Sequence, residues 1–294
     1  MTVYDQTRLA LGTAQFGLPY GIANQAGQVS RKVVSAMLQL AVSNGIDTLD
    51  TAIAYGESEV ALGQAGTQGF NVVTKLPALP DDCLDVISWV MEQVDASFTR
   101  LGVSSVYALL LHRPEQLLGP HGKELYEALY ALKERGKVQK VGVSIYNPLE
   151  LDALTRLFHF DLVQAPFNII DSRLYRAGWL QRLKDDEVEI HTRSAFLQGL
   201  LLMPEENLPS KFTPWSDLFQ RWHTWQAEHH VSALHACLAF SLSFPEIDRV
   251  IVGADSINQL DQIIKASRLT LPDNLPDLYC EAENLINPAR WSCL

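Results

Sequence analysis

The sequence predicts a single (β/α)8 barrel that takes in residues 1–294. Short apolar segments typical of strands alternate with amphipathic helical segments along the whole chain, and we count eight of the short segments. Such alternation implies parallel strands joined by right-handed crossovers, which eight units close into one barrel. No shift in composition and no internal repeat marks a second domain. The expected strands are Leu9–Gly12, Thr48–Asp50, Val72–Lys75, Val106–His112, Val138–Val143, Leu162–Gln164, Glu189–Ser194 and Arg249–Val252.

Three of the helices between these strands are predicted most clearly. One starts at Ser30, a good N-cap, and carries its apolar residues on one face. The others cover Asp81 to about Leu101 and Glu124–Arg135, and each is followed by a glycine. The segment Leu202–Pro214 contains three prolines and little periodicity, so we expect a long loop after strand seven, of the kind that often acts as a lid.

The composition excludes several classes of function. A formal charge of −11, from 23 basic and 34 acidic residues without a basic stripe, disfavours nucleic acid and membrane as partners. The start of the chain, Met1–Asp5, has no signal-peptide pattern, and the four cysteines are scattered without a CxxC pair. We therefore expect a cytoplasmic protein, a monomer or a weak homo-oligomer, with no metal site.

Polar side chains stand at the ends of three consecutive strands. Asp50, Lys75 and His112 end strands two, three and four, and Tyr55 lies in the loop after Asp50. In a barrel these ends meet on one rim, where active sites lie. A buried lysine needs a partner, which Asp50 provides, and an ammonium group is expected to lower the pKa of a neighbouring tyrosine. Tyr55 then becomes a general acid, and His112 orients a carbonyl oxygen.

Each of these residues also has an ordinary structural explanation. Asp50 can cap a helix entry, Lys75 can extend its ammonium group to solvent, and His112 can be a satisfied histidine before a turn. All four at matching strand ends, in one order, favour a site over four separate coincidences.

Longer motifs around these residues resemble the aldo-keto reductase superfamily, in its bacterial type. The most specific is the stretch Gly45–Glu59, and three more follow in the family's order: Val72–Lys75, Leu109–Pro114 and Gly136–Ser144. The resemblance covers essentially the whole chain. It implies that Asp50, Tyr55, Lys75 and His112 form a catalytic tetrad, with hydride from a nicotinamide and a proton from Tyr55.

The sequence contains neither a GxGxxG nor a GxxxxGK motif, so a Rossmann or P-loop nucleotide site is not expected. The resemblance instead implies a dinucleotide laid across the barrel mouth. The cofactor-binding residues that it implies are Gly12, Thr13, Ser144, Gln164, Arg193, Ser194, Leu197, Gly199, Gly253, Asp255 and Gln259. Two positions depart from the family pattern, since Ile145 follows Ser144 where relatives commonly have asparagine, and Arg193 stands where many have tyrosine.

The choice of cofactor is open at this point. Most relatives use NADP(H) and place a cation after strand eight, but this chain has Asp255 and Gln259 there, with Lys265 further on. A carboxylate repels a 2′-phosphate and accepts hydrogen bonds from ribose hydroxyls, which favours NAD(H). We expect NADP(H) from the family, with NAD(H) as the alternative.

A small carbonyl compound, an aldehyde, ketone or aldose, is the expected substrate and partner. Candidate pocket residues are Gln15, Phe16, Tyr20, Arg113 and Phe167, although the two phenylalanines fit plain packing equally well. Arg113 with Arg193 suggests a polar or anionic compound. Two other functions remain: a slow-turnover nucleotide-sensing regulatory subunit on the same barrel, and an unrelated barrel isomerase or lyase.

Overall fold

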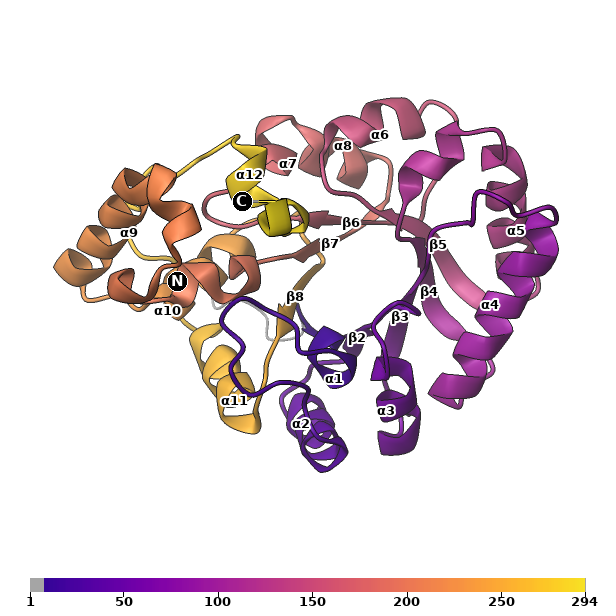
Figure 1. Cartoon of the computed structure of the whole chain (residues 1–294), viewed down its shortest axis with the longest axis horizontal. Coiled ribbons are helices and arrows are strands. Elements are labelled where there is room, and N and C mark those ends of the chain that lie inside the picture. Colours follow the sequence, from indigo (N-terminus) through magenta and orange to yellow (C-terminus); the bar gives the residue numbers. More distant parts are fainter. Residues whose placement is uncertain (1–7, 294) are drawn as a thin grey trace.

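The computed structural model describes residues 8–293, so Met1–Asp5, on which the signal-peptide expectation rests, lies outside the described residues. The chain forms a closed barrel of parallel strands in the order β1 to β8, surrounded by helices (Figure 1). The predicted (β/α)8 barrel is therefore confirmed. The strands are β1 (Leu9–Gly12), β2 (Thr48–Asp50), β3 (Asn71–Leu76), β4 (Val106–Leu111), β5 (Val138–Ser144), β6 (Leu162–Pro166), β7 (Glu189–Arg193) and β8 (Arg249–Gly253).

Helices connect successive strands and cover the outside of the barrel. The longer ones are α2 (Arg31–Ser43), α3 (Ser58–Ala65), α4 (Val86–Leu101), α5 (Gly122–Glu134), α6 (Leu149–Leu154), α8 (Trp179–Asp185), α9 (Ser216–His229), α10 (Ala233–Leu242) and α11 (Ile257–Ala266). Short helices are α1 (Ala14–Gly17), α7 (Arg173–Arg176) and α12 (Glu283–Ile286), with 3-10 turns η2 (Pro114–Leu118), η3 (Leu197–Leu202), η4 (Glu205–Asn207), η5 (Ser210–Trp215) and η6 (Pro288–Cys293).

The start of α4 differs from the sequence prediction. The helix begins at Val86 and not at Asp81, because Asp85 is its N-cap and accepts a hydrogen bond from the Ser88 amide at 3.0 Å. Asp81 and Asp82 lie in the preceding turn. The other end is as expected, since Gly102 adopts the left-handed conformation of a C-cap with φ 67°.

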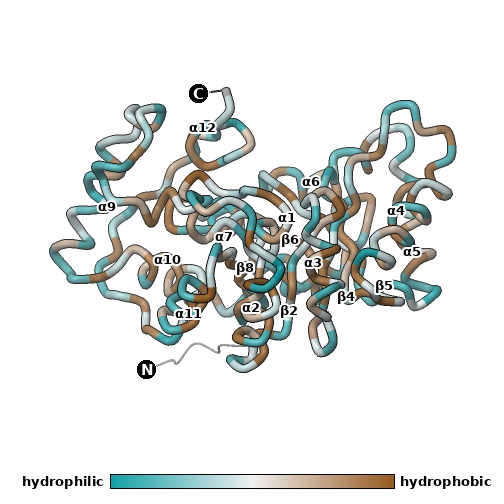
Figure 2. Tube along the Cα trace, turned by 60° about the horizontal axis from the view of Figure 1, so that its bottom comes forward, coloured by the Kyte–Doolittle hydropathy of each residue, from teal (hydrophilic) through white to brown (hydrophobic). Residues whose placement is uncertain are grey.

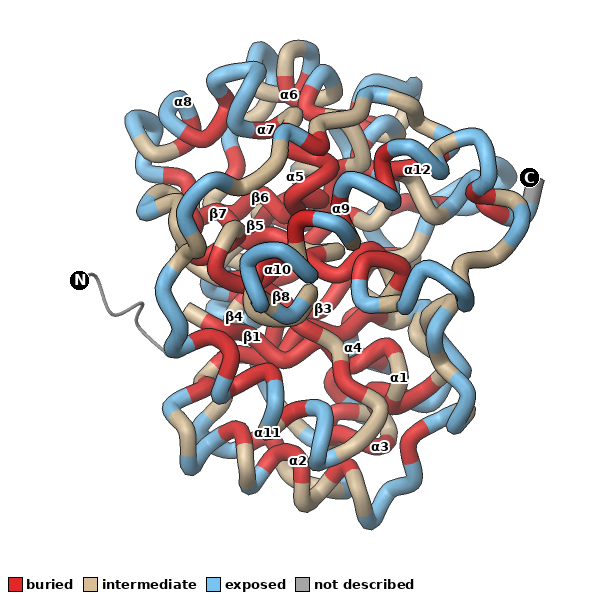
Figure 3. Tube along the Cα trace, turned by 90° about the vertical axis from the view of Figure 1, so that its left-hand side faces the viewer, coloured by how far each residue is buried: buried red, intermediate tan, exposed pale blue. Residues whose placement is uncertain are grey.

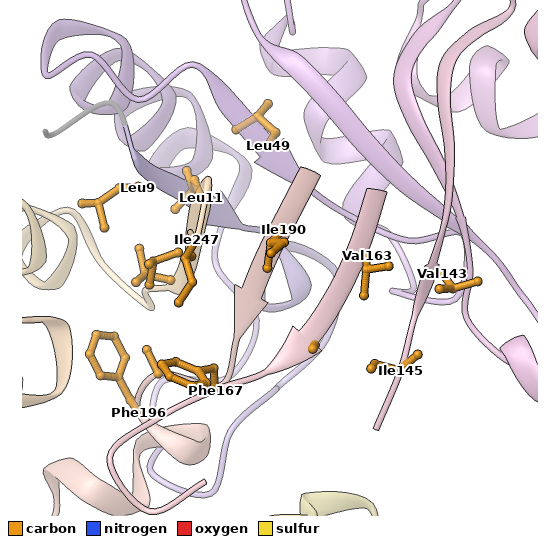
Figure 4. Packing of buried hydrophobic residues seen from close by; sticks show 14 of the residues in the cluster. Leu9, Leu11, Leu49, Val143, Ile145, Val163, Phe167, Ile190, Phe196 and Ile247 are labelled. Carbon is orange, nitrogen blue, oxygen red and sulfur yellow. The ribbon is translucent and has the colours of Figure 1, made fainter. Parts of the chain in front are cut away.

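Alternation along each strand divides the core into two parts. Side chains that point outward pack against the helices in one large buried cluster, which includes Leu49, Val143, Val163 and Ile190 (Figure 4). Apolar side chains that point inward form a small cluster inside the barrel, made of Val73, Ala108, Leu110 and Leu162. Figure 3 shows the buried chain at the centre of the molecule and exposed segments at its periphery, and Figure 2 shows the hydropathy of each residue along the same trace.

This alternation also positions the polar residues at the strand ends. On β3, Val73 faces the barrel interior, and Lys75, two residues on, faces the same way. Within residues 8–293, no helix combines the length and apolar character needed to cross a bilayer. The same residues contain no group of three His, Cys, Asp or Glu side chains placed to hold a metal ion.

Candidate active site

A buried ion pair lies inside the barrel where β2 and β3 end. The Lys75 Nζ donates to both carboxylate oxygens of Asp50 at 2.8 Å and to the Thr51 carbonyl oxygen at 2.8 Å. The Lys75 side chain is 0% exposed and that of Asp50 is 5% exposed. Burial lowers the pKa of Lys75, and the Asp50 charge opposes this change. All three ammonium protons are thus used within the chain, and the charge is neutralised in place.

The loop after β2 is held by residues of the same sequence motif. The Ser58 hydroxyl donates to the Thr13 carbonyl oxygen at 2.8 Å, and the buried Glu59 accepts from Thr74 on β3 and Arg100 on α4 at 2.8 Å each. A side chain at Gly17 would meet the Tyr55 carbonyl oxygen at 1.8 Å, so a glycine is required there. This part of the motif therefore fixes the position of Tyr55.

Tyr55 and His112 lie above the ion pair. Their rings meet edge to face with centroids 6.0 Å apart, and the Lys75 Nζ lies 5.0 Å from the centroid of the Tyr55 ring. Among residues 8–293, neither the Tyr55 hydroxyl nor the His112 ring nitrogens have a hydrogen-bond partner. Both groups are therefore free to bond to a ligand.

The sequence-based expectation that Tyr55 has a lowered pKa is wrong. Burial raises the pKa of Tyr55 and the Asp50 carboxylate raises it further, and both outweigh the lowering effect of Arg193. The Lys75 charge does not reverse this because Asp50 compensates it at 2.8 Å. Tyr55 therefore rests as a neutral phenol that can donate a proton.

His112 is held in its neutral form. Burial, together with the positive charges of Lys75 and Arg193, lowers the pKa of His112 to about 4. A neutral imidazole still donates one hydrogen bond. His112 is therefore suited to bonding a carbonyl oxygen and not to acting as a cation.

A cavity of about 730 Å³ opens above these groups. This volume falls within the range of small-molecule and cofactor sites. The candidate residues from the sequence that line it are Gly12, Thr13, Gln15, Tyr20, Asp50, Tyr55, His112, Arg193, Ser194, Gly199, Gly253, Asp255 and Gln259. The structure thus brings most of the candidate cofactor residues to one wall, beside the candidate tetrad.

Other expected pocket residues lie away from the cavity wall. Phe16 is fully buried in the core, and Phe167, shown among the buried side chains in Figure 4, packs on Phe240 and Phe244 with ring centroids 5.5 and 4.9 Å away. The packing interpretation therefore applies to both. Arg113 is exposed and outside the wall, because the chain turns outward at Pro114.

Three expected cofactor residues are also outside the cavity lining. Leu197 is fully buried in the core. Ser144 and Gln164 are buried as well, and the Gln164 Nε2 donates to Asp50 Oδ1 at 2.7 Å. The Ser144 hydroxyl in turn donates to Gln164 Oε1 at 3.1 Å. Their hydrogen bonds are therefore made within the protein.

Sequence reasoning missed a stacked pair on the cavity wall. The Arg193 guanidinium lies 4.4 Å from the centroid of the Tyr146 ring and donates to the Ile145 carbonyl oxygen at 3.0 Å. Tyr146 directly follows Ile145, which stands where relatives commonly have asparagine, and this difference was the one feature of the sequence that could have pointed to the pair. The pair places a cation beside Tyr55 and His112, and Arg193 is the single Lys or Arg that lines the cavity within the described residues.

A second missed feature is the segment Leu18–Asn24, between α1 and α2. Five of its residues line the cavity, Tyr20 accepts a hydrogen bond from Gln198 at 3.2 Å, and Asn24 donates to Asp255 at 3.2 Å. It therefore connects the loops that follow β7 and β8.

The segment Leu202–Pro214, expected as a long loop, differs from that expectation in its secondary structure. The segment folds into short 3-10 turns, and Phe212 is buried against Trp291. Of the residues in this segment, all of which the structure describes, only Leu202 lines the cavity.

Comparisons with known proteins agree with this architecture. The model of the Aldo/keto reductase family matches residues 8–275. Aldo-keto reductase YhdN of Bacillus subtilis is 23% identical, with 97% of this chain and 93% of that protein covered. The NADH-specific methylglyoxal reductase of Escherichia coli is also 23% identical, with 91% of each chain covered.

A solved structure shows the same fold. The holo form of an aldo-keto reductase from Bacillus halodurans superposes with a TM-score of 0.75 at 19% identity, covering 94% of each chain. The family uses nicotinamide cofactors, which removes the unrelated isomerase or lyase. The family model spans the barrel from its first strand to the end of the last helix around it, and the chain belongs to the aldo/keto reductase family of oxidoreductases that reduce carbonyl groups.

Proposed function

We propose that this protein reduces a small aldehyde or ketone, with NADH as the preferred hydride donor and the Tyr55 hydroxyl as the proton donor. The observation that carries the proposal is the buried Asp50–Lys75 pair beneath a neutral, unbonded Tyr55 hydroxyl at the cavity. A bound nicotinamide supplies the hydride. All other steps below belong to side chains of this chain.

Tyr55 holds its proton until the carbonyl oxygen becomes basic. Transfer to that oxygen leaves a phenolate, which the Lys75 ammonium 5.0 Å from the ring centroid and the Arg193 guanidinium on the wall both stabilise. His112 donates a hydrogen bond to the same oxygen and orients it. Asp50 keeps Lys75 charged and fixed in the buried site.

The cavity wall suits a nicotinamide dinucleotide. Gly12 and Gly253 sit at the ends of the adjacent strands β1 and β8 and both line the cavity. Arg193 and Tyr146 present flat groups on which a ring can stack. Asp255 and Gln259 offer acceptors for ribose hydroxyls.

The preference for NADH departs from the NADP(H) that the family resemblance led us to expect. The wall around Asp255 continues with Gln259 and Gln262, and Arg193, the one lysine or arginine among the described lining residues, is stacked on Tyr146 at the end of β7. Lys265 does not line the cavity and pairs with Asp261 at 2.6 Å on the surface. A 2′-phosphate near Asp255 would be repelled and left without a cation. The Escherichia coli relative is named as NADH-specific, which supports the same choice.

The test compares NADH and NADPH oxidation over an aldehyde panel that includes methylglyoxal, for wild type and Tyr55→Phe. We expect kcat to fall by about 10²–10⁴-fold in the variant, the size of a lost general acid, with nucleotide binding retained. NADH should bind more tightly than NADPH, as measured by quenching of intrinsic fluorescence. Tyr107→Phe is the matched control, because it removes an interior hydroxyl that bonds Glu189 at 2.6 Å, away from the cavity.

Other outcomes would each redirect the proposal. An equal fall in kcat for Tyr55→Phe and Tyr107→Phe would mean that the loss is structural, and Tyr55 would then not be the proton donor. Nucleotide binding without turnover on any substrate would favour the nucleotide-sensing role. Tighter binding of NADPH would overturn the cofactor preference alone.

A further inference from the structure

The chain between α1 and α2 contacts the loop after β8 at Asn24 (Figure 1). The Asn24 Nδ2 donates to Asp255 Oδ1 at 3.2 Å, and both residues line the cavity. Asp255 lies just before α11, whose residue Gln259 lines the same wall. The contact therefore joins two loops 231 positions apart in the sequence, at the part of the cavity where the proposed function places a cofactor ribose.

Hydrogen bonds within its own turn fix the direction of the Asn24 amide. The side-chain oxygen, Oδ1, accepts from the backbone N–H groups of Ala26 and Gly27 at 2.9 and 2.8 Å. If the amide were reversed, its NH2 group would face these two N–H donors and all of them would lose their acceptor. The NH2 group is therefore the one that faces Asp255, and it also donates to the carbonyl oxygens of Tyr20 and Gly27.

Close packing supports this turn against the loop after β7. A Cβ at Gly199 would meet the Ala23 Cβ at 2.6 Å, so the two backbones approach as closely as a glycine allows. The Tyr20 hydroxyl accepts from Gln198 of the same loop at 3.2 Å. Asn24 is thus a donor on a supported backbone, and it can fix the direction of a side chain that bonds to it.

A fixed donor restricts the directions that the Asp255 carboxylate can take. One of its oxygens is bonded to Asn24, and the backbone N–H of Asp255 donates to Gln259 Oε1 at 2.7 Å. A carboxylate has about four acceptor sites, so the sites that Asn24 does not use can accept from ribose hydroxyls. A carboxylate held at this point also repels a 2′-phosphate, whereas one that rotates into solvent repels it less.

We propose that Asn24 is a positioning residue that holds the Asp255 carboxylate toward the cofactor ribose and thereby sets the preference for NADH over NADPH. The inference rests on the cofactor preference in the proposed function. It adds a residue from the far end of the sequence to the loop that recognises the ribose. Asn24 acts through Asp255, because its amide is already bonded within the chain.

Asn24→Ser separates the contact with Asp255 from the turn. A serine hydroxyl can still accept from the N–H groups of the turn, but it is too short to reach Asp255. We expect the dissociation constant of NADH, from quenching of intrinsic fluorescence, to rise about 3- to 10-fold, the size of one lost hydrogen bond. The dissociation constant of NADPH should not rise, because the released carboxylate can turn away from the 2′-phosphate. Equal rises for both nucleotides would mean a loosened loop and would overturn the proposal.

Two further variants control this result. Gln25→Ser changes the exposed neighbour of Asn24, which does not line the cavity, and should leave both dissociation constants as in wild type. In an Asp255→Asn background, Asn24→Ser should no longer change the ratio of the two dissociation constants, since the charge that Asn24 holds is absent. A ratio that changes equally with and without the Asp255 carboxylate would overturn the proposal.

A measurement without nucleotide tests the contact itself. Asn24→Asp keeps an acceptor for the turn but puts a second carboxylate against Asp255, and this repulsion raises the pKa of the pair in the folded state. At neutral pH the variant should therefore be less stable than Asn24→Asp combined with Asp255→Asn, in which an amide again faces a carboxylate. The difference should narrow as pH falls through the raised pKa. A difference that does not change with pH would refute the contact and the inference with it.

The inference and the proposed function can fail separately. A wild type that prefers NADH, with the same preference in Asn24→Ser, would overturn the inference and leave the proposed function intact. A wild type that binds NADPH more tightly would overturn the proposed cofactor preference, and the role of Asn24 in setting it would be refuted as well.

Discussion

Both ends of the barrel interior hold a lysine bonded to a carboxylate, but the two pairs differ in what surrounds them. At the cavity end, the Lys75–Asp50 pair is 0% and 5% exposed. At the opposite end, which we call the floor cluster, Glu189 accepts from Lys140, Tyr107 and His191, and the pair is 32% and 13% exposed. Neither Lys140 nor Glu189 lines the cavity.

The polar groups of the two ends are used differently. In the floor cluster, the tyrosine hydroxyl and one histidine nitrogen are both bonded to Glu189. At the cavity end, the Tyr55 hydroxyl and the His112 ring have no partner within residues 8–293. The floor cluster also leaves one buried atom without a partner among the described residues, the Nδ1 of His191, but His191 does not line the cavity, whereas Tyr55 and His112 do. The comparison therefore predicts different consequences for matched substitutions at the two ends.

The largest difference is expected between Lys75→Met and Lys140→Met. Lys75→Met leaves a buried carboxylate unpaired, so the free energy of unfolding should fall by about 3–5 kcal/mol and turnover should be lost. Lys140→Met leaves Glu189 with two other donors and partial exposure, so it should cost about 1 kcal/mol and retain turnover. Chemical denaturation and steady-state kinetics measure both.

A second variant separates the charge from the chemistry at the cavity end. Asp50→Asn combined with Lys75→Met removes both charges, so stability should recover while turnover stays lost. Recovery of turnover in this double variant would show that the ion pair is not part of the mechanism. Equal losses of stability and turnover in Lys75→Met and Lys140→Met would show that the two ends of the barrel do not differ.

The sequence was sufficient for the barrel and for the four residues around the ion pair, because both depend on local pattern. Alternation on β3 puts Lys75 inside, and a lysine there requires a carboxylate such as Asp50. The direction in which the pKa of Tyr55 shifts could not be predicted from the sequence, because it depends on which charge Asp50 compensates in the folded protein. The pairing of Gln164 with Asp50 joins residues 114 positions apart, and no local signal indicates it.

Local pattern also failed where two roles share one residue type. Phe16 and Phe167 both follow strand ends, as pocket residues do, but their packing against residues far along the chain decides which way they face. Leu18–Asn24 looks like a plain turn, and its contacts with Gln198 and Asp255 come from loops far along the chain.

A smaller, pH-dependent effect is expected from the floor cluster. Burial by itself would raise the pKa of Glu189, but hydrogen bonds and charge from His191 and Lys140 outweigh it and hold the pKa well below its usual range. The folded pKa lies below the unfolded one, so this stabilisation is present above about pH 4.5 and is lost as pH falls further. Glu189→Gln should therefore flatten the loss of stability with acid below pH 4.5. Denaturation curves that keep the wild-type acid slope would contradict this.

The smallest effect at neutral pH is expected from His112. Its folded pKa of about 4 lies below the ordinary 6.5, so the unfolded chain takes up a proton first as pH falls. Stability is therefore lost between about pH 6.5 and 4, and His112→Gln should remove that loss while changing stability little at pH 7 and above. This window lies above that of Glu189, so the two ends of the barrel can be titrated separately. Arg193→Met removes one of the charges that lower the folded pKa of His112, so it should raise the lower end of this window, which ¹³C NMR of the imidazole measures directly. An imidazole that titrates near pH 6.5 in wild type would mean that His112 is charged in weakly acidic solution, and the neutral hydrogen-bond donor proposed for the carbonyl oxygen would then be wrong.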